Sequence, residues 1–215
     1  MSVEQATASV ILHDGSILTY DPVEHKYFRD GKPVCGVSEA SQRTGFEREF
    51  NAAAELAALR GTNVHKYTEL RELGQLDNYE IDPAAQPYLA EYDAGVAHLN
   101  REMGIGLPWS GIEQMDAREV IPGFWLAGRM DRVSAGSAAI VDIKTSKNPT
   151  PAPKNYRLKM ALYAMIFQSK RKILLYLTGS GKFDPSVAIQ ELTNPQDDEV
   201  AREVCHILLW RKTRA

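Results

Sequence analysis

Three charged residues near the middle of the chain have the types and spacing that metal-dependent phosphodiester chemistry needs. Asp142 and Lys144 follow the apolar run 138–141, and Asp131 precedes Asp142 by eleven residues. A pair of carboxylates binds a hard divalent cation through oxygen, and a lysine beside it can steady an attacking water or a phosphate. These residues therefore predict metal-assisted phosphodiester cleavage at the end of a strand.

The spacing of carboxylate, any residue and lysine is uninformative by itself. Glu24 with Lys26 has the same spacing in a short polar stretch near a glycine, which is typical of a solvated hairpin tip, and so does Asp30 with Lys32. Asp142 instead follows four apolar residues, so it shares one face of a predicted buried strand with the lysine two residues on. A charged pair there must find partners or a metal, because burying an unpaired charge is costly.

Two further residues are candidates to join this site. Asp131 ends the neighbouring strand of a predicted antiparallel meander, and a tight turn at 135–137 would bring it level with Asp142. The alternative is that Asp131 and Asp142 are surface acids neutralised by Arg129 and Arg132. His65 either pairs with a neighbouring side chain on the surface of a helix or is a ligand of the metal ion. A neutral imidazole ligand would favour manganese while still permitting magnesium.

Length and composition predict a single domain. With 215 residues, 44% of them hydrophobic, the chain can bury a core of ordinary size. We expect one domain over residues 1–215, with an N-terminal hairpin (about 8–40) and a C-terminal helix (about 195–212) added to its core. The sequence has no apolar run long enough to span a membrane and no signal-peptide pattern, so we expect a cytoplasmic protein.

The two cysteines exclude some kinds of metal site, and the distribution of charge favours a phosphate-containing substrate. Cys35 and Cys205 lie far apart without a CxxC partner, which excludes a four-cysteine zinc site and a four-thiolate iron–sulfur cluster within this chain. The net charge is −3, but residues 124–172 hold ten basic residues against two acids, a local charge of +8. We interpret Lys170, Arg171 and Lys172 as a solvated helix end. The other cations are where a phosphate backbone would lie: Arg129, Arg132, Lys144, Lys147, Lys154, Arg157 and Lys159.

The hydrophobic pattern predicts an α/β protein. Strands are expected at 10–20, 27–37, 111–120, 125–133, 138–144, 173–178 and 187–192. Helices are expected at 50–59, resuming at 63–73 after a break near Gly61, and at 83–103, 155–168 and from Pro195 onward. Segment 179–182 has the glycines and lysine of a phosphate loop, but Tyr176 replaces the first glycine and Phe183 the Ser/Thr. We therefore expect a hairpin turn there.

Four short motifs follow one another along the chain: Gly61-x-x-x-His65, Gly128-x-x-Asp131, Asp142-x-Lys144 and an aromatic helix ending Leu162-Tyr163-Ala164. Their order and spacing resemble the RecB-type branch of the PD-(D/E)xK nuclease superfamily. The stretch from Tyr20 to Ser38 is also similar to the N-terminal part of phage-encoded exonucleases. The motifs cover most of the chain from about residue 20 to residue 165.

The resemblance implies a fold and an activity. The fold is a restriction-endonuclease-like core, with a central mixed sheet (a three-strand meander plus further strands) flanked by helices. The activity is that of a DNA exonuclease dependent on Mg²⁺ or Mn²⁺, acting on single strands or duplex ends in recombination, repair or phage DNA processing. A recombination or single-strand-annealing protein is an implied partner. The alternatives are a structure-specific endonuclease or junction resolvase, and a non-catalytic DNA-binding or assembly module that kept the fold.

The resemblance also assigns roles by position. His65, Asp131 and Asp142 match the family's metal ligands, often completed by the main-chain carbonyl of the residue corresponding to Ile143. Lys144 matches the catalytic lysine. Relatives with iron–sulfur clusters are not close models, because the chain has too few cysteines.

Two details stay open at the level of sequence. An acid from the first meander strand often joins such sites, and Glu113 and Glu119 are both available; we keep Glu113 as the candidate, although hairpin register does not follow from sequence. Lys159 stands where the family usually has glutamine, four residues before Tyr163. The two share a helix face, so a role near the phosphate or the DNA strand is retained with a cation in place of an amide.

Overall fold

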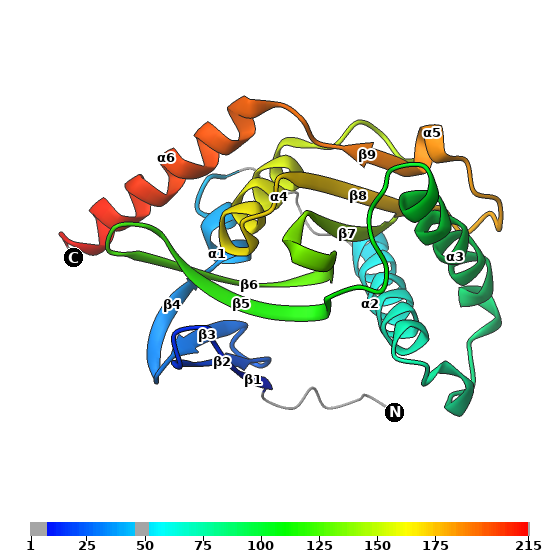
Figure 1. The fold of residues 1–215 in the computed structure, drawn as a ribbon, viewed down its shortest axis with the longest axis horizontal. Helices are drawn as coiled ribbons and strands as arrows, with labels where there is room; N and C mark the ends of the chain where they lie inside the picture. Colours follow the sequence, from blue (N-terminus) through cyan, green and yellow to red (C-terminus); the bar gives the residue numbers. More distant parts are fainter. Residues whose placement is uncertain (1–7, 46–51, 215) are drawn as a thin grey trace.

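The computed structural model describes residues 8–45 and 52–214, and its helices cover both faces of a mixed sheet (Figure 1). This is the α/β arrangement expected. The strands are β1 (Ala8–Ile11), β2 (Ile17–Asp21), β3 (Lys26–Arg29), β4 (Lys32–Gly36), β5 (Gly111–Ile121), β6 (Phe124–Val133), β7 (Ala139–Thr145), β8 (Arg171–Leu177) and β9 (Ile189–Glu191). The helices are α1 (Val37–Gln42), α2 (Ala52–Glu72), α3 (Gln86–Arg101), α4 (Lys154–Phe167), α5 (Pro185–Ala188) and α6 (Pro195–Lys212).

Strand β6 is the branch point of the sheet. One of its edges pairs antiparallel with β5 along the whole hairpin. The other edge is shared, because β4 pairs in parallel with Leu126 and Ala127 whereas β7 pairs antiparallel with Arg132 and Val133. Within the described residues, positions 128–131 therefore have no ladder on that edge. We call residues 128–131 the β6 gap.

Two hydrophobic cores lie on opposite faces of the sheet. Ile140 and Leu174 belong to the core beneath α4 and α6. Val141, Ile143 and Ile173, at the alternate positions of the same strands, belong to the core beneath α2 and α3. This alternation follows from the two-residue period of a strand, and burial on both faces explains why β7 and β8 are almost continuously apolar. The three-strand meander expected at 111–144 is confirmed by the pairing of β5, β6 and β7.

The N-terminal strands form an antiparallel unit that packs against the β5–β6 hairpin through a third core, which includes both Leu18 and Met115 (Figure 1). Asp30 and Gly31 both have positive φ, of 47° and 73°, as a two-residue hairpin turn requires, and the predicted hairpin there is confirmed. The strand expected over 10–20 is wrong. It is two strands, because Gly15, with φ 82°, reverses the chain between them.

The helix break expected near Gly61 is wrong, because α2 runs through this residue. A glycine costs about 1 kcal/mol relative to alanine inside a helix, yet α2 is continuous from Ala52 to Glu72. A Cβ at Gly61 would lie 3.3 Å from the Oγ1 atom of Thr145 on β7. The glycine thus allows the helix to approach the strand closely rather than ending it. The expected residues 50 and 51 of this helix lie outside the described residues.

The segment before α6 also differs from expectation. The strand expected over 187–192 is reduced to β9, because Asp184 accepts a hydrogen bond from the N–H of Ser186 (3.0 Å) and Pro185 starts a helical turn. The C-terminal helix begins as predicted, with Asn194 accepting from the N–H of Gln196 at 3.1 Å. None of the helices in residues 8–45 and 52–214 is long and apolar enough to cross a membrane.

The loop after β8 encloses a buried carboxylate. Glu91 of α3 accepts hydrogen bonds from the N–H groups of Thr178, Gly179 and Gly181 and from the hydroxyls of Thr178 and Ser180, at 2.5 to 3.1 Å. The amides that a phosphate loop would offer to a nucleotide are therefore taken by the protein itself. Burial acts to raise the pKa of Glu91, but these hydrogen bonds outweigh it and leave the pKa below its ordinary value of 4.5.

Substituting Glu91→Gln tests this role. Because the pKa is lowered in the folded state, the carboxylate stabilises the fold above pH 4.5 and loses this effect as the pH falls below it. We expect the free energy of unfolding at pH 7 to drop by about 2–3 kcal/mol in urea titrations. The difference from wild type should shrink towards pH 3. Exposed Glu80→Gln should stay within about 0.5 kcal/mol, and a Glu91→Gln protein as stable as wild type at pH 7 contradicts the account.

Candidate active site

Asp131 lies in the β6 gap and connects β6 to its neighbours through its side chain. Its Oδ2 atom accepts a hydrogen bond from the N–H of Ile143 on β7 (2.6 Å) and lies 3.4 Å from Nδ1 of His65 on α2. The β6–β7 ladder ends at Arg132 and Val141, so this carboxylate replaces the next backbone acceptor. Asp131 is buried. The Asp131 carboxylate therefore connects β6 to β7 and to α2, and these two contacts fix its orientation.

Glu113 lies across the β5–β6 ladder from Asp131. The pairs on either side, Ile112 with Arg132 and Gln114 with Met130, put it opposite that acid. Its φ of 48° is in the left-handed region, which costs a non-glycine residue about 1–3 kcal/mol and takes it out of the ladder. Such strain is kept where surrounding structure enforces it, most often at functional sites.

The register also separates the two acids that the sequence left open. Glu119 pairs with Trp125 near the tip of the hairpin, where its Oε1 atom accepts a hydrogen bond from the N–H of Gly123 at 2.6 Å. Glu113 has its Oε2 atom 3.3 Å from Nε of Arg129, while its Oε1 atom is buried without a hydrogen-bond partner among the described residues. A buried, unpaired carboxylate oxygen is costly, and a cation would satisfy it.

Three side chains could bind a metal ion together. One ligand atom from each of His65, Glu113 and Asp131 lies within 4.8 Å of the other two. Two carboxylates and one imidazole suit a divalent cation that accepts oxygen and nitrogen ligands. Asp142, which the sequence assigned to the metal, lies outside this group.

Asp142 and Lys144, which precede and follow Ile143 on β7, form an ion pair. The Nζ atom of Lys144 is 2.5 Å from Oδ2 of Asp142, and its ammonium lies 5.1 Å from the ring centre of Tyr156 on α4. A cavity of about 130 Å³ opens beside them. It is lined by these three residues together with Ser38, Lys159, Met160 and Tyr163.

Burial is the largest single influence on the pKa of each of these acids. Burial, followed by the charge of Asp131, raises the pKa of Glu113 to about 7. Burial also raises the pKa of Asp142, against the opposing effect of Lys144. For Asp131, burial is outweighed by His65 and Lys144, and the pKa falls to about 2. Carboxylates crowded in this way are stabilised by a cation, which a metal supplies most strongly.

A close approach explains the glycine of the β6 gap. A Cβ at Gly128 would lie 2.5 Å from Cε1 of Tyr163 and 3.2 Å from Cγ2 of Val37. The tyrosine of α4 therefore packs against bare backbone where β6 has no neighbouring strand.

The structure corrects the assignment of Arg132 to DNA binding. Arg132 is fully buried; its Nε donates to the hydroxyl of Tyr92 (2.8 Å) and its Nη1 to the carbonyl of Asp131 (2.6 Å). The hydroxyl of Tyr92 in turn donates to Glu72 at 2.6 Å. The guanidinium thus faces the interior beneath α3 and cannot reach a DNA strand, because a charge count along the sequence does not show which way a side chain points.

Several other cations of residues 124–172 are paired with acids from further along the chain. Arg157 is 2.6 Å from Asp197, which reduces its availability for DNA. The solvated helix end expected at 170–172 is wrong, because Arg171 starts β8 and lies 2.7 Å from Glu191. Lys172 is buried and its Nζ donates to Asp198 at 2.5 Å. Lys147 and Lys154, which lie near the two ends of the loop between β7 and α4, are exposed, and Arg129 is partly exposed beside Glu113.

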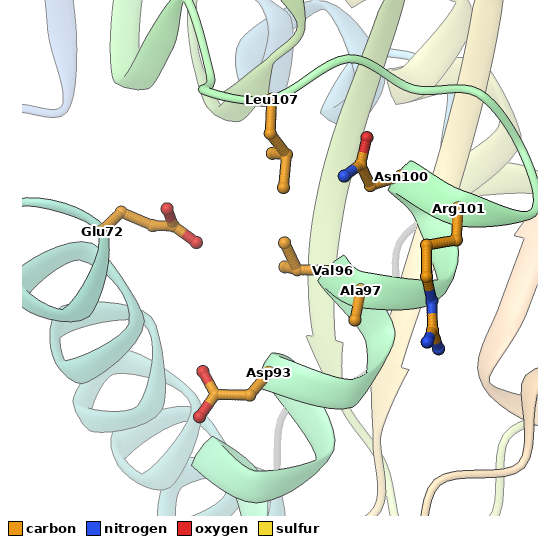
Figure 2. Close-up of a pocket in the computed structure, with 7 residues that line it drawn as sticks. All are labelled: Glu72, Asp93, Val96, Ala97, Asn100, Arg101 and Leu107. Atoms are coloured by element: carbon orange, nitrogen blue, oxygen red, sulfur yellow. The ribbon is translucent and has the colours of Figure 1, made fainter.

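A larger depression lies away from these residues. It measures about 340 Å³, is open to solvent and lies between the end of α2, α3 and Leu107 (Figure 2). Its polar side chains include Glu72, Asp93, Asn100 and Arg101. None of the residues that the sequence singled out lines it, whereas Asp142, Lys144, Lys159 and Tyr163 line the smaller cavity.

The comparisons with known proteins show the family of the chain. The family model described as the PD-(D/E)XK nuclease superfamily matches residues 37–214. The chain belongs to this superfamily. Of the four motif regions, the three with charged residues supply the groups that meet around the β6 gap, and the fourth supplies Tyr163. No curated protein is significantly similar to the chain in sequence.

Solved structures bear on the fold of this superfamily member. A proposed exonuclease from Eubacterium rectale is similar with a TM-score of 0.50 and 16% identity, over 86% of this chain and 75% of that chain. This likeness and the family match confirm the restriction-endonuclease-like core. The protein SSO0001 has a TM-score of 0.34 and 15% identity, over 80% of this chain and 84% of that chain, which is too weak to carry an argument.

Sequence reasoning missed two contacts of this nuclease-family site. Tyr156 lies under the ammonium of Lys144. It precedes Lys159 and Tyr163 by three and seven residues, so helical spacing could have placed it on the same face of α4. The contact between Arg129 and Glu113 depends on hairpin register and left no signal in the sequence.

Gly128→Ala tests the close approach of Tyr163. Replacing a glycine by alanine stabilises a protein by about 0.4–1 kcal/mol, because it lowers the entropy of the unfolded chain. Overpacking, however, costs about 1–3 kcal/mol. We expect a net loss of about 1–2 kcal/mol in the free energy of unfolding, measured in urea. Gly106→Ala is the matched control, because a Cβ there meets nothing within 4 Å. Equal stability of the two variants would contradict the packing argument.

Proposed function

We propose that this chain is a deoxyribonuclease that uses Mg²⁺ or Mn²⁺ and removes nucleotides from DNA ends. The observation that carries the proposal is the group of His65, Glu113 and Asp131 beside the pair of Asp142 and Lys144. Membership of the nuclease superfamily supports hydrolysis of nucleic acid. The similar structure from Eubacterium rectale, described as a proposed exonuclease, supports action at ends.

In this proposal, the metal is held by His65, Glu113 and Asp131, with Asp142 and the main-chain carbonyl of Ile143 as further ligands. The unpaired Oε1 atom of Glu113 and the mixture of carboxylates and imidazole fit such an ion. When bound, the ion polarises the scissile phosphate and lowers the pKa of a coordinated water. The N–H of Ile143 holds Asp131 in place, so the ligand is preorganised.

Lys144 is the proposed catalytic lysine. Its ammonium is held between the Asp142 carboxylate and the Tyr156 ring, next to the cavity where a phosphate would enter. From that position it orients the attacking water or stabilises the negative charge that develops on the phosphate. Both roles depend on its placement.

The DNA path that we propose runs along the cavity and the loop 146–153. Lys159 and Tyr163 line the cavity, and Lys147 and Lys154 are exposed at the ends of the loop. Cations in these positions bind phosphates, and the tyrosine offers an aromatic face. Recombination, repair or phage DNA processing in the cytoplasm, with an annealing protein as partner, is the setting that we propose.

Substituting Lys144→Ala separates chemistry from metal binding. We expect metal-dependent release of nucleotides from end-labelled DNA to fall by about 10²–10⁴-fold, while Mn²⁺ binding is retained. Asp131→Asn should lose both, and a chelator should abolish wild-type cleavage. The matched control is Lys182→Ala, an exposed lysine in the loop after β8 that should cleave like wild type. Near-wild-type cleavage by Lys144→Ala removes the lysine from the mechanism.

Linear and circular single-stranded DNA distinguish the mode of cleavage. An exonuclease needs an end, so we expect the linear strand to be digested and the circle to persist under identical metal conditions. Duplex DNA with blunt or recessed ends, run in parallel, shows which end is accepted. Cutting of the circle at a comparable rate would point to a structure-specific endonuclease.

A further inference from the structure

The N-terminal strands contact the proposed site although they precede the region matched by the family model, which begins at residue 37. They lie beside the β5–β6 hairpin (Figure 1). Tyr20 of β2 has its ring centre 4.8 Å from that of Tyr27, and its hydroxyl is 2.7 Å from Nδ1 of His25. The guanidinium carbon of Arg129 lies 5.6 Å from the centre of the Tyr20 ring.

Arg129 connects this aromatic surface to the metal-ligand candidates. Its Nε atom is 3.3 Å from Oε2 of Glu113. The other oxygen of that carboxylate is buried without a hydrogen-bond partner among the described residues. One oxygen of Glu113 is therefore paired with the guanidinium, and the same carboxylate offers one ligand atom to a group whose ligand atoms lie within 4.8 Å of each other.

We propose that Tyr20 is a positioning residue of the nuclease site, which holds Arg129 so that Arg129 orients the Glu113 carboxylate towards the metal. The proposal rests on the proposed function, because it assumes that Glu113 is a ligand. It assigns the N-terminal strands a part in metal binding rather than in folding alone. Tyr20 touches neither the metal nor the substrate, and its effect passes through Arg129.

The physical basis is the flexibility of arginine. An arginine side chain that is partly exposed has many rotamers, and each contact that limits them lowers the entropy still to be lost when it binds a carboxylate. The face of the Tyr20 ring attracts the guanidinium. Glu113 needs such support because its backbone is in the left-handed region and its second oxygen is unpaired. Outer partners of metal ligands typically change affinity by about 10–100-fold when removed.

Mn²⁺ affinity of the full chain without DNA, measured by electron paramagnetic resonance, tests the proposal. Tyr20→Leu leaves every charge in place and removes only the ring and hydroxyl. We expect Mn²⁺ to bind about 3–10-fold more weakly, below the range for direct partners because Tyr20 acts one step further out. Tyr20→Phe keeps the ring face and should restore binding to within about twofold.

Trp125→Leu is the matched control. It removes the other arginine–ring contact of this region, in which the guanidinium of Arg29 lies 3.8 Å from the Trp125 ring. Trp125 is six residues before Asp131 on β6, about 20 Å along the strand. We expect unchanged Mn²⁺ affinity. Thermal melts of all variants show whether any loss of binding reflects unfolding.

A double-substitution cycle separates action through Arg129 from a general loosening of the fold. In an Arg129→Met background, Tyr20→Leu should weaken Mn²⁺ binding no further. A wild-type affinity for Tyr20→Leu, or an equal loss with and without Arg129, overturns the proposal. If the wild-type protein binds no Mn²⁺ and cleaves no DNA, the proposed function fails instead.

Discussion

The hydrogen bond from the N–H of Ile143 to the Asp131 carboxylate is the interaction on which the site depends. Strand β6 exchanges one neighbour for another, and for residues 128–131 its second edge has no ladder. Side chains fill this opening: Asp131 reaches β7 and α2, and Tyr163 packs on Gly128. The same break in the sheet thus buries a carboxylate and exposes backbone to α4.

A buried cation, Arg132, and the hydroxyl of Tyr92 support the acids around this opening. Arg132 donates to the carbonyl of Asp131 and to Tyr92, which links it to α3 and α2. Glu113 and Asp142 keep raised pKa values, chiefly because burial disfavours ionisation of their carboxyl groups. Arg132 and Tyr92 hold the backbone of Asp131 rigidly, and the carboxyl groups of Glu113 and Asp142 lie close by. Together they favour the binding of a divalent ion.

Local patterns predicted the elements well, and the reasons for the errors are physical. The meander over 111–144 followed from alternating apolar residues and short turns, and the turn at Asp30 from residues that tolerate positive φ. Gly61 was misjudged because its role is to let α2 approach β7, a contact between segments more than eighty residues apart. A helix propensity describes the helix alone and contains no information about that neighbour.

The sequence by itself determined the element order, the superfamily resemblance and the residues that could do chemistry, because these depend on residue type and short spacing. Only the tertiary structure decided which of them meet. Hairpin register selected Glu113 over Glu119, and the folded structure buries Arg132, which hydrogen-bonds Tyr92. Three of the ten cations behind the local charge of +8 are paired with Asp197, Glu191 and Asp198, which lie beyond residue 172 in the sequence. Electrostatic interaction depends on distance in space, which sequence separation does not give.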